Sequence, residues 1–195
     1  DEGTVDFEGH PGEKITQGLE GLSDRLKEYY ALGARFTKWR AVIAIGDGIP
    51  THDCIEENSR ILAEYASVAQ KERFVPIAEP EVLLDGGHTI EKAEEVTTNT
   101  LRAVFAALEK KRVDLQGLIL KSSMVLSGKE CSEQADVRQV AEATIRTFKN
   151  SVPDTIAGIV FLSGGQTPQQ ATENLAEIIK QGPQPWPLSF SFSRA

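Results

Sequence analysis

The chain has 195 residues, of which 40% are hydrophobic and 26% are charged, a balance typical of a globular protein. Its formal net charge of −8 argues against nucleic-acid binding, because proteins that bind the phosphate backbone need a basic surface. A small phosphorylated substrate remains compatible with this charge, since one local basic pocket is enough to bind it.

No apolar run reaches the roughly 18 residues that suggest a membrane span. The first residues, DEGTVDFEGH, lack the basic and apolar regions of a signal peptide. Cys54 and Cys131 lie far apart and form no CxxC motif, so we expect no disulfide framework, no membrane association and a reducing, cytoplasmic setting. The chain starts at Asp and stops just after PWPLSFSFSRA, so we expect a fragment of a longer protein.

Helix-like and strand-like segments alternate along the chain. The first twenty or so residues are glycine-rich and weakly patterned. Ser23 or Asp24 is the expected cap of the first helix, and Asp53 that of the second. No low-complexity linker divides residues 1–195, which we interpret as one domain. In chain order, the pattern predicts a helix at 23–33, a strand at 38–45, a helix at 53–72, a strand at 74–83, a helix at 90–112, a strand at 115–121, a helix at 134–150, a strand at 156–165, a helix at 168–181 and a strand at 187–193.

Strands that alternate with helices indicate an α/β fold with a parallel sheet. Four polar residues accompany successive strands at intervals of 41, 42 and 42 residues, namely Lys38, Glu79, Lys121 and Ser163. Equal repeats of this kind favour a barrel over a doubly wound sheet. A complete (β/α)8 TIM barrel takes about 250 residues, so we expect an incomplete, C-terminal portion of one.

Lys121 is the first candidate for chemistry, because the apolar run Leu118–Leu120 ends on it. A lysine amine must lose its proton before it attacks a carbonyl, and desolvation or a neighbouring cation such as Lys38 favours the neutral amine. The alternative is a lysine at a strand edge that extends its ammonium group into water. The place of Lys121 in the equally spaced series favours catalysis.

Glu79 and Glu81, in the sequence IAEPE, are two residues apart and share one face of a strand. Paired carboxylates suit general acid–base catalysis, because their repulsion keeps one of them protonated. Pro80 between them indicates that the strand gives way to a loop there. A solvated acidic turn remains equally open on the spacing alone.

The segment FLSGGQT (161–167) follows a strand and precedes a helix. Gly164 and Gly165 let backbone amides approach an anion, and Thr167 can cap the helix. This arrangement predicts a phosphate site at a helix N-terminus, with Arg194 as a bidentate partner. The alternative is a plain Gly-Gly turn.

The three histidines, His10, His52 and His88, are isolated in the sequence and show no HxH or HxxxH spacing. A zinc or iron site needs at least three convergent ligands, so we expect no metal. A metal-dependent barrel that uses Glu79, Glu81 and His88 as ligands is the least favoured alternative.

Five stretches in series resemble the class I fructose-bisphosphate aldolase family, and most closely its bacterial branch. They are GARFTKWRAVIAI, FVPIAEPEVLLDGGHTI, LILKSSMV, GIVFLSGGQT and PWPLSFSFSRA. The resemblance implies a (β/α)8 barrel of which this chain holds about strands four to eight. It implies a carbon–carbon lyase of glycolysis and gluconeogenesis that cleaves fructose 1,6-bisphosphate to dihydroxyacetone phosphate and glyceraldehyde 3-phosphate.

The resemblance also implies roles for individual residues. Lys121 matches the Schiff-base lysine, Glu79 the acid–base that forms and dehydrates the carbinolamine, and Glu81 its neighbouring carboxylate. Lys38 matches a lysine that assists at the reacting centre. The residues that match substrate-binding and phosphate-binding positions are Arg40, Ser163, Gly164, Arg194 and nearby Ser191. A covalent Schiff base replaces any metal or cofactor, and members of the family commonly form homotetramers.

Four residues at three places depart from the family pattern. Ser122-Ser123 stand where the family has Pro-Asn, Ser193 where it has Gly, and Phe7 where it has Lys. These departures and the strands expected to be missing leave open a non-catalytic remnant that binds sugar phosphates or a partner protein. A different Schiff-base barrel enzyme, such as a transaldolase-like or deoxyribose-phosphate aldolase-like protein, also stays open, because the sequence does not show a preference for a substrate with two phosphates.

Overall fold

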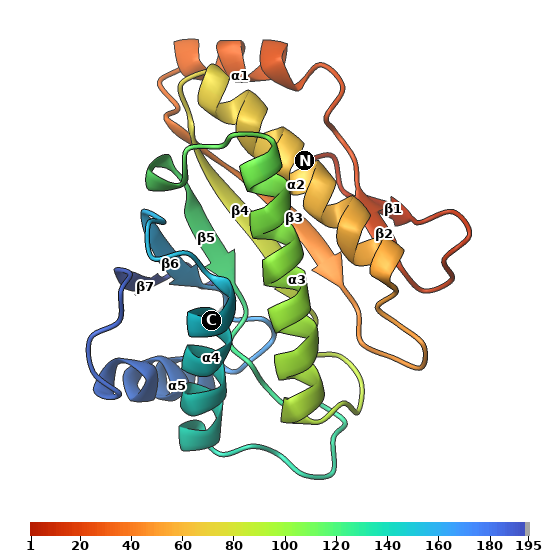
Figure 1. Cartoon of the computed structure of the whole chain (residues 1–195), viewed down its shortest axis with the longest axis vertical. Coiled ribbons are helices and arrows are strands. Elements are labelled where there is room, and N and C mark those ends of the chain that lie inside the picture. The colour runs from red at the N-terminus through yellow and green to blue at the C-terminus, as the bar shows by residue number, and fades with distance from the viewer. Residues whose placement is uncertain (194–195) are drawn as a thin grey trace.

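The computed structural model describes residues 1–193 and contains a five-stranded parallel sheet with helices packed along one face (Figure 1). The strands are β1 (Thr4–Asp6), β2 (Lys14–Thr16), β3 (Phe36–Ile43), β4 (Val75–Val82), β5 (Ile119–Ser122), β6 (Gly158–Phe161) and β7 (Leu188–Phe190). The helices are α1 (Leu22–Ala31), α2 (His52–Lys71), α3 (Ile90–Lys110), the 3-10 turn η1 (Leu115–Gly117), α4 (Val137–Ser151) and α5 (Pro168–Lys180).

The strand order in the large sheet is β3-β4-β5-β6-β7, and all four neighbouring pairs are parallel. Each crossover runs through a helix or a helix-containing segment and returns to the next position in the sheet. A doubly wound sheet reverses its order at a switch point, whereas a barrel wall does not. The sequential order therefore confirms the predicted α/β barrel architecture, of which five strands are present.

The N-terminal segment contains an element that the sequence pattern did not predict. Strands β1 and β2 pair antiparallel, with Val5 opposite Ile15. Each strand has three residues, too few for a period of two to stand out among the surrounding glycines.

Several strand predictions were wrong at their boundaries. The strands predicted at 156–165 and 187–193 end at Phe161 and Phe190, and two further differences have a local cause. Residues 115–117 form the 3-10 turn η1, because the Asp114 side chain accepts a hydrogen bond from the Gln116 amide, and β5 begins only at Ile119. Strand β4 continues through Pro80 to Val82 instead of giving way to a loop. The ladder between β4 and β5 ends at Ala78, so β4 accommodates a residue without an N–H group just beyond that point.

Two cap predictions were also wrong. Helix α2 is capped by Thr51, whose side chain accepts from the Cys54 amide, while Asp53 lies inside the first turn. Helix α1 begins after Gly21, which has a φ of 64° and makes no side-chain cap. The two helices therefore begin two or three residues earlier than the polar side chains suggested.

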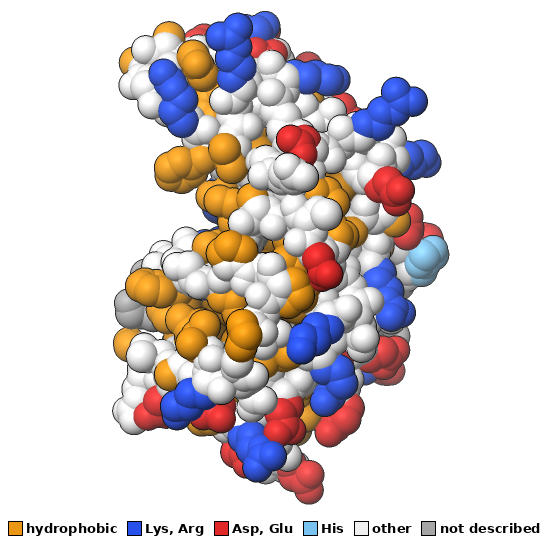
Figure 2. Space-filling view, turned by 60° about the vertical axis from the view of Figure 1, so that its left-hand side comes forward, with side chains coloured by type: hydrophobic (Ala, Val, Ile, Leu, Met, Phe, Trp, Pro, Cys, Tyr) orange, Lys and Arg blue, Asp and Glu red, His pale blue; other side chains and the backbone are white. Residues whose placement is uncertain are grey.

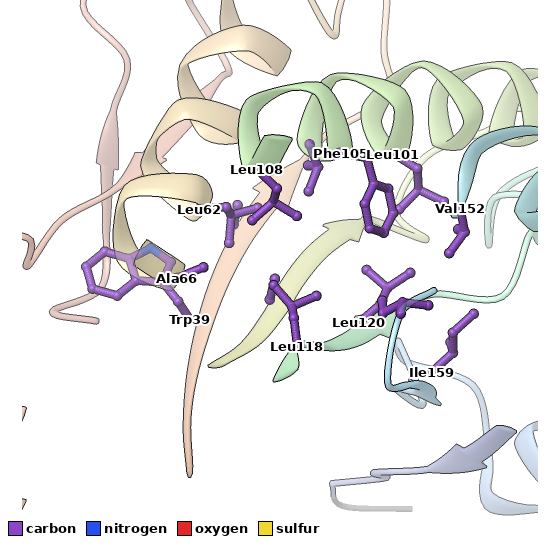
Figure 3. Packing of buried hydrophobic residues seen from close by; sticks show 14 of the residues in the cluster. Trp39, Leu62, Ala66, Leu101, Phe105, Leu108, Leu118, Leu120, Val152 and Ile159 are labelled. Atoms are coloured by element: carbon purple, nitrogen blue, oxygen red, sulfur yellow. The ribbon is translucent and has the colours of Figure 1, made fainter. Parts of the chain in front are cut away.

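The main core lies between the sheet and the helices (Figure 3). Trp39 in β3, Leu120 in β5 and Leu118 just before β5 point to this side and are fully buried. Because side chains alternate along a strand, their sequence neighbours Lys38, Arg40 and Lys121 lie on the opposite face. Packing of the apolar face thus sets which polar groups line the inside of the barrel wall. The labelled residues in Figure 3 are Trp39, Leu62, Ala66, Leu101, Phe105, Leu108, Leu118, Leu120, Val152 and Ile159.

Candidate active site

A buried carboxylate connects three neighbouring strands on the inner face of the sheet. The Glu79 Oε1 atom lies 3.1 Å from Lys121 Nζ, and its Oε2 atom lies 3.1 Å from Lys38 Nζ. The side chains of Glu79 and Lys121 are only 5% and 12% exposed, whereas that of Lys38 is 39% exposed. One carboxylate therefore joins a shielded lysine to a more accessible one.

A second ion pair lies two residues further along the same strands. The Arg40 Nε group donates to Glu81 Oε2, and Arg40 stands opposite Glu79 in the register of β3 and β4. Glu81 is mostly buried, and Arg40 is partly exposed. The period of two thus places both carboxylates on one face, as predicted, and each faces a cation from β3.

These contacts decide between the two interpretations of the acidic pair and of Lys121. A solvated acidic turn would leave Glu79 and Glu81 in water, but both are buried and paired. A lysine that extends into water would be exposed at its end, but Lys121 is held on a buried carboxylate. The amine of Lys121 lies close enough to the Glu79 carboxylate to exchange a proton with it. General acid–base chemistry requires this proximity.

The turn after β6 is held by its own side chains and by helix α5. The amide of Gln166 donates to Ser163 O at 3.0 Å, and Gln166 Nε2 donates to the same carbonyl at 3.0 Å. Asn174 Nδ2 donates to Gln166 Oε1 at 2.7 Å, which connects the turn to the body of α5. Gly164 and Gly165 have φ values of 60° and 86°, a conformation that favours glycine.

Helix α5 starts as the sequence predicted. Thr167 accepts from the Gln170 amide while the Gln170 side chain accepts from the Thr167 amide, a capping box with Pro168 in the first turn. Within residues 1–193, the amides of Ser163, Gly164 and Gly165 donate to no protein acceptor. The turn therefore offers free N–H groups close to a helix N-terminus, the arrangement that binds phosphate.

A cavity of about 750 Å³ brings the predicted site residues together. Gln166 is a lining residue that the sequence reasoning passed over, although it belongs to the SGGQ string that drew attention to the turn. Arg194, the predicted bidentate partner of the phosphate, lies outside the described residues. The lining residues are Lys38, Arg40, Glu79, Glu81, Lys121, Leu162, Ser163, Gly164, Gly165, Gln166, Ser191 and Ser193.

Of the four residues that depart from the family pattern, Ser193 lines this cavity, whereas Ser122, Ser123 and Phe7 do not. Ser123 Oγ donates to Val82 O at 3.0 Å and so joins β5 to the end of β4. Ser193 O accepts from Ser163 Oγ at 3.3 Å. Phe7 instead stacks on the His10 ring, with centroids 4.2 Å apart, and does not line the cavity.

Within residues 1–193, no three His, Cys, Asp or Glu side chains gather in a way that could hold a metal ion. Glu79 and Glu81 contact lysine and arginine instead of His88. Along the same residues, no helix is long and apolar enough to cross a membrane.

Comparison with known proteins assigns the chain to a family. The profile of the glycolytic fructose-bisphosphate aldolase class-I family matches residues 1–195. A probable fructose-bisphosphate aldolase class 1 from Xanthomonas axonopodis pv. citri is 55% identical over 195 residues, and fructose-bisphosphate aldolase from Dictyostelium discoideum is 47% identical over 197 residues. Both alignments cover all of this chain, which spans 58% and 55% of the length of those relatives.

A solved structure gives the same assignment in three dimensions. Fructose-bisphosphate aldolase from Plasmodium falciparum, in a ternary complex with TRAP and a small-molecule inhibitor, superposes with a TM-score of 0.97 at 47% sequence identity. The match covers 99% of this chain and 56% of that protein. The sheet order, the inner-face lysines and carboxylates, the glycine turn and these similarities agree, and the chain belongs to the class-I fructose-bisphosphate aldolase family.

Proposed function

We propose that this chain carries the reacting part of a class I aldolase that reversibly cleaves fructose 1,6-bisphosphate to dihydroxyacetone phosphate and glyceraldehyde 3-phosphate. The observation that carries the proposal is the buried Glu79 carboxylate with one lysine on each oxygen. Lys121 acts as the nucleophile because its amine is shielded from water and has a proton acceptor at 3.1 Å.

The first half of the reaction forms an iminium ion. The neutral amine of Lys121 attacks C2 of the ketose, a C–N bond forms, and the ketone oxygen takes up a proton to give a carbinolamine. A second proton on that hydroxyl expels water and leaves the iminium. Glu79 receives protons from the amine and returns them to the oxygen, and the positive charge of Lys38 stabilises the negative charge that develops there.

The second half breaks the carbon–carbon bond. The C4 hydroxyl gives its proton to a carboxylate of the cavity, the C4–O bond becomes a carbonyl, and the electron pair of the C3–C4 bond moves into the iminium. Glyceraldehyde 3-phosphate leaves, and the resulting enamine takes up a proton at C3. Water then hydrolyses the iminium, which releases dihydroxyacetone phosphate and restores the amine. The iminium formed with Lys121 is the electron sink, so the proposed reaction uses no metal or cofactor.

The remaining lining residues bind the substrate in this proposal. Ser163, Gly164 and Gly165 bind a phosphate group through amides and a hydroxyl, together with Ser191 and Arg194. Arg40 binds a substrate oxygen from the opposite side of the cavity. We further propose a cytoplasmic setting and assembly into homo-oligomers, which sedimentation would test.

Reductive trapping tests the proposal directly. The protein is incubated with dihydroxyacetone phosphate, reduced with borohydride and digested, and the modified peptide is found by mass spectrometry. We expect an adduct on Lys121 that Lys121→Met abolishes and that Lys111→Met, at a partly exposed lysine just after α3, leaves unchanged. Absence of an adduct on folded protein would contradict the enzyme proposal and favour a non-catalytic sugar-phosphate-binding remnant.

A further inference from the structure

A lysine from a different loop lies against the glycine turn. Lys129 belongs to the segment between β5 and α4, whereas Gly165 follows β6. A Cβ atom built on Gly165 would lie 2.9 Å from Lys129 Nζ and 3.2 Å from Lys129 Cε. The ammonium end of Lys129 is therefore packed beside the backbone of a residue that lines the cavity.

The backbone around Lys129 is fixed by contacts with the loop after β4. The amides of Gly128, Lys129 and Glu130 donate to His88 O, Leu84 O and Gly86 O at 2.8, 2.9 and 3.0 Å. The approach is so close that a Cβ atom at Gly128 would lie 2.2 Å from Gly86 O. These main-chain contacts fix the position of the Lys129 backbone, from which the side chain extends.

The charge of Lys129 is only partly satisfied. Its Nζ lies 3.3 Å from Asp85 Oδ1, the single polar partner of that ammonium among residues 1–193. An ammonium group has three N–H donors, and this side chain is 49% exposed. Donors remain for an anion that binds at the turn.

We propose that Lys129 is a further phosphate-binding residue, which donates to the phosphate of the ketone that reacts with Lys121. This inference rests on the proposed function. It adds a cation from the segment between β5 and α4 to the amides of the glycine turn. Lys129 does not itself line the cavity, but its ammonium lies against the backbone of Gly165, which does, and so it would reach a phosphate held by the Gly164 and Gly165 amides. Its consequence is a preference for phosphorylated over unphosphorylated ketones.

The test compares two ketones that differ in the phosphate group. Borohydride trapping is measured on the full chain as a function of dihydroxyacetone phosphate and of dihydroxyacetone concentration. In Lys129→Gln we expect the concentration for half-maximal trapping to rise about 10-fold for the phosphorylated ketone, the scale of one charge-assisted hydrogen bond at a half-exposed site. For dihydroxyacetone we expect no change, and Lys129→Arg should retain most of the affinity.

Lys111→Gln is the matched control, because Lys111 is also a partly exposed lysine that pairs with an acidic residue, Glu64. This substitution removes the same charge as Lys129→Gln. Binding of inorganic phosphate, followed by phosphorus NMR, is measured on the same variants and does not depend on the reactivity of Lys121. We expect Lys129→Gln to weaken it about 10-fold and Lys111→Gln to leave it unchanged.

The outcomes separate the inference from the proposed function. If the wild type gives no adduct with either ketone, the enzyme proposal fails, and weaker phosphate binding in Lys129→Gln would still support the inference. The inference is overturned if Lys129→Gln raises the concentration for half-maximal trapping equally for both ketones. It is also overturned if this variant binds inorganic phosphate as tightly as the wild type does. Failure of the wild type to bind inorganic phosphate would overturn it as well.

Discussion

Glu79 is the residue on which the arrangement of the site depends. From β4, its two carboxylate oxygens each lie 3.1 Å from a lysine Nζ, that of Lys38 in β3 on one side and that of Lys121 in β5 on the other. Without its charge, the two ammonium groups would repel each other with no counter-charge between them. Glu81 has a simpler contact, since its one ion pair among residues 1–193 is with Arg40.

This difference predicts the effect of removing each carboxylate charge. Glu79→Gln should lower the rate of adduct formation with dihydroxyacetone phosphate by about 100-fold or more, because an acid–base group typically contributes at least that much. Glu81→Gln should lower it less. Rapid quenching with borohydride measures both rates, and thermal melting verifies that each variant is folded. Equal rates for the two variants would contradict the assigned role of Glu79.

His88 predicts a pH dependence of stability. Burial lowers the pKa of His88 below its ordinary value of 6.5, and its Nδ1 atom is buried without a partner among the described residues. His88 therefore takes up a proton at a higher pH in the unfolded chain than in the folded one. The free energy of unfolding must rise with pH between the lowered pKa of the folded state and the ordinary pKa of the unfolded state. The contribution is fully present above about pH 6.5 and is lost as the pH falls towards and through the lowered pKa.

We expect the free energy of unfolding to fall more steeply between pH 7 and pH 5 in the wild type than in His88→Gln. Urea denaturation at a series of pH values measures both curves. Parallel curves would show that His88 takes up its proton equally well in both states.

At the scale of the elements, the loops at the carboxyl ends of β4 and β5 are held together by a close approach of main chains. Gly128 is the residue that permits it, since a Cβ atom there would lie 2.2 Å from Gly86 O. Gly117, in η1, offers a comparison: its added Cβ would meet only side-chain atoms, at 3.4 and 3.6 Å.

Gly128→Ala should therefore destabilise the protein by about 1–3 kcal/mol, the usual cost of forcing atoms into a packed space. Gly117→Ala should change stability much less. Urea midpoints compare the two variants. If Lys129 binds phosphate as proposed, Gly128→Ala should also weaken phosphate binding, because the shift of its loop moves the lysine.

The elements also show how far local pattern reaches. The helices were predicted to within a few residues, because their apolar stripes are long: α3 buries eight residues along 21. Strand β4 was placed correctly, but the inference of a loop at Pro80 failed, since it used a local rule where the pairing of neighbouring strands decides. The β1–β2 pair was missed because strands of three residues carry too little pattern.

At the scale of the whole molecule, the sheet has two outer strands. On one side is β3, and on the other is β7, a strand of three residues whose Phe190 is 60% exposed. Hydrophobic side chains gather around the hollow on the face that Figure 2 turns forward. An unpaired strand next to exposed apolar groups is a template for association with another chain.

The chain on its own should therefore self-associate in a concentration-dependent way, and Phe190→Lys should reduce this association because a charge on an outer strand opposes pairing. Leu32→Lys is the control: Leu32 is 85% exposed but follows α1 and lies on no strand. Light scattering and sedimentation measure the effect. A soluble, monomeric wild type that melts cooperatively would contradict this prediction.

The sequence by itself determined the order of the helices and of the five strands of the large sheet, the family, and which residues share a face. Lys38 and Arg40, like Glu79 and Glu81, are two residues apart, and in any strand that spacing puts them on one side. These properties follow from local geometry, which depends only on residues near one another in the chain.

Only the tertiary structure decided which charges meet. The two oxygens of Glu79 contact lysines 41 and 42 positions away, and Lys129 reaches a glycine on the next loop. Such contacts depend on the register between strands and on how closely their loops approach. Those distances are set by interstrand hydrogen bonds and by packing of the helices over the sheet, which the spacing of residues along one segment does not specify.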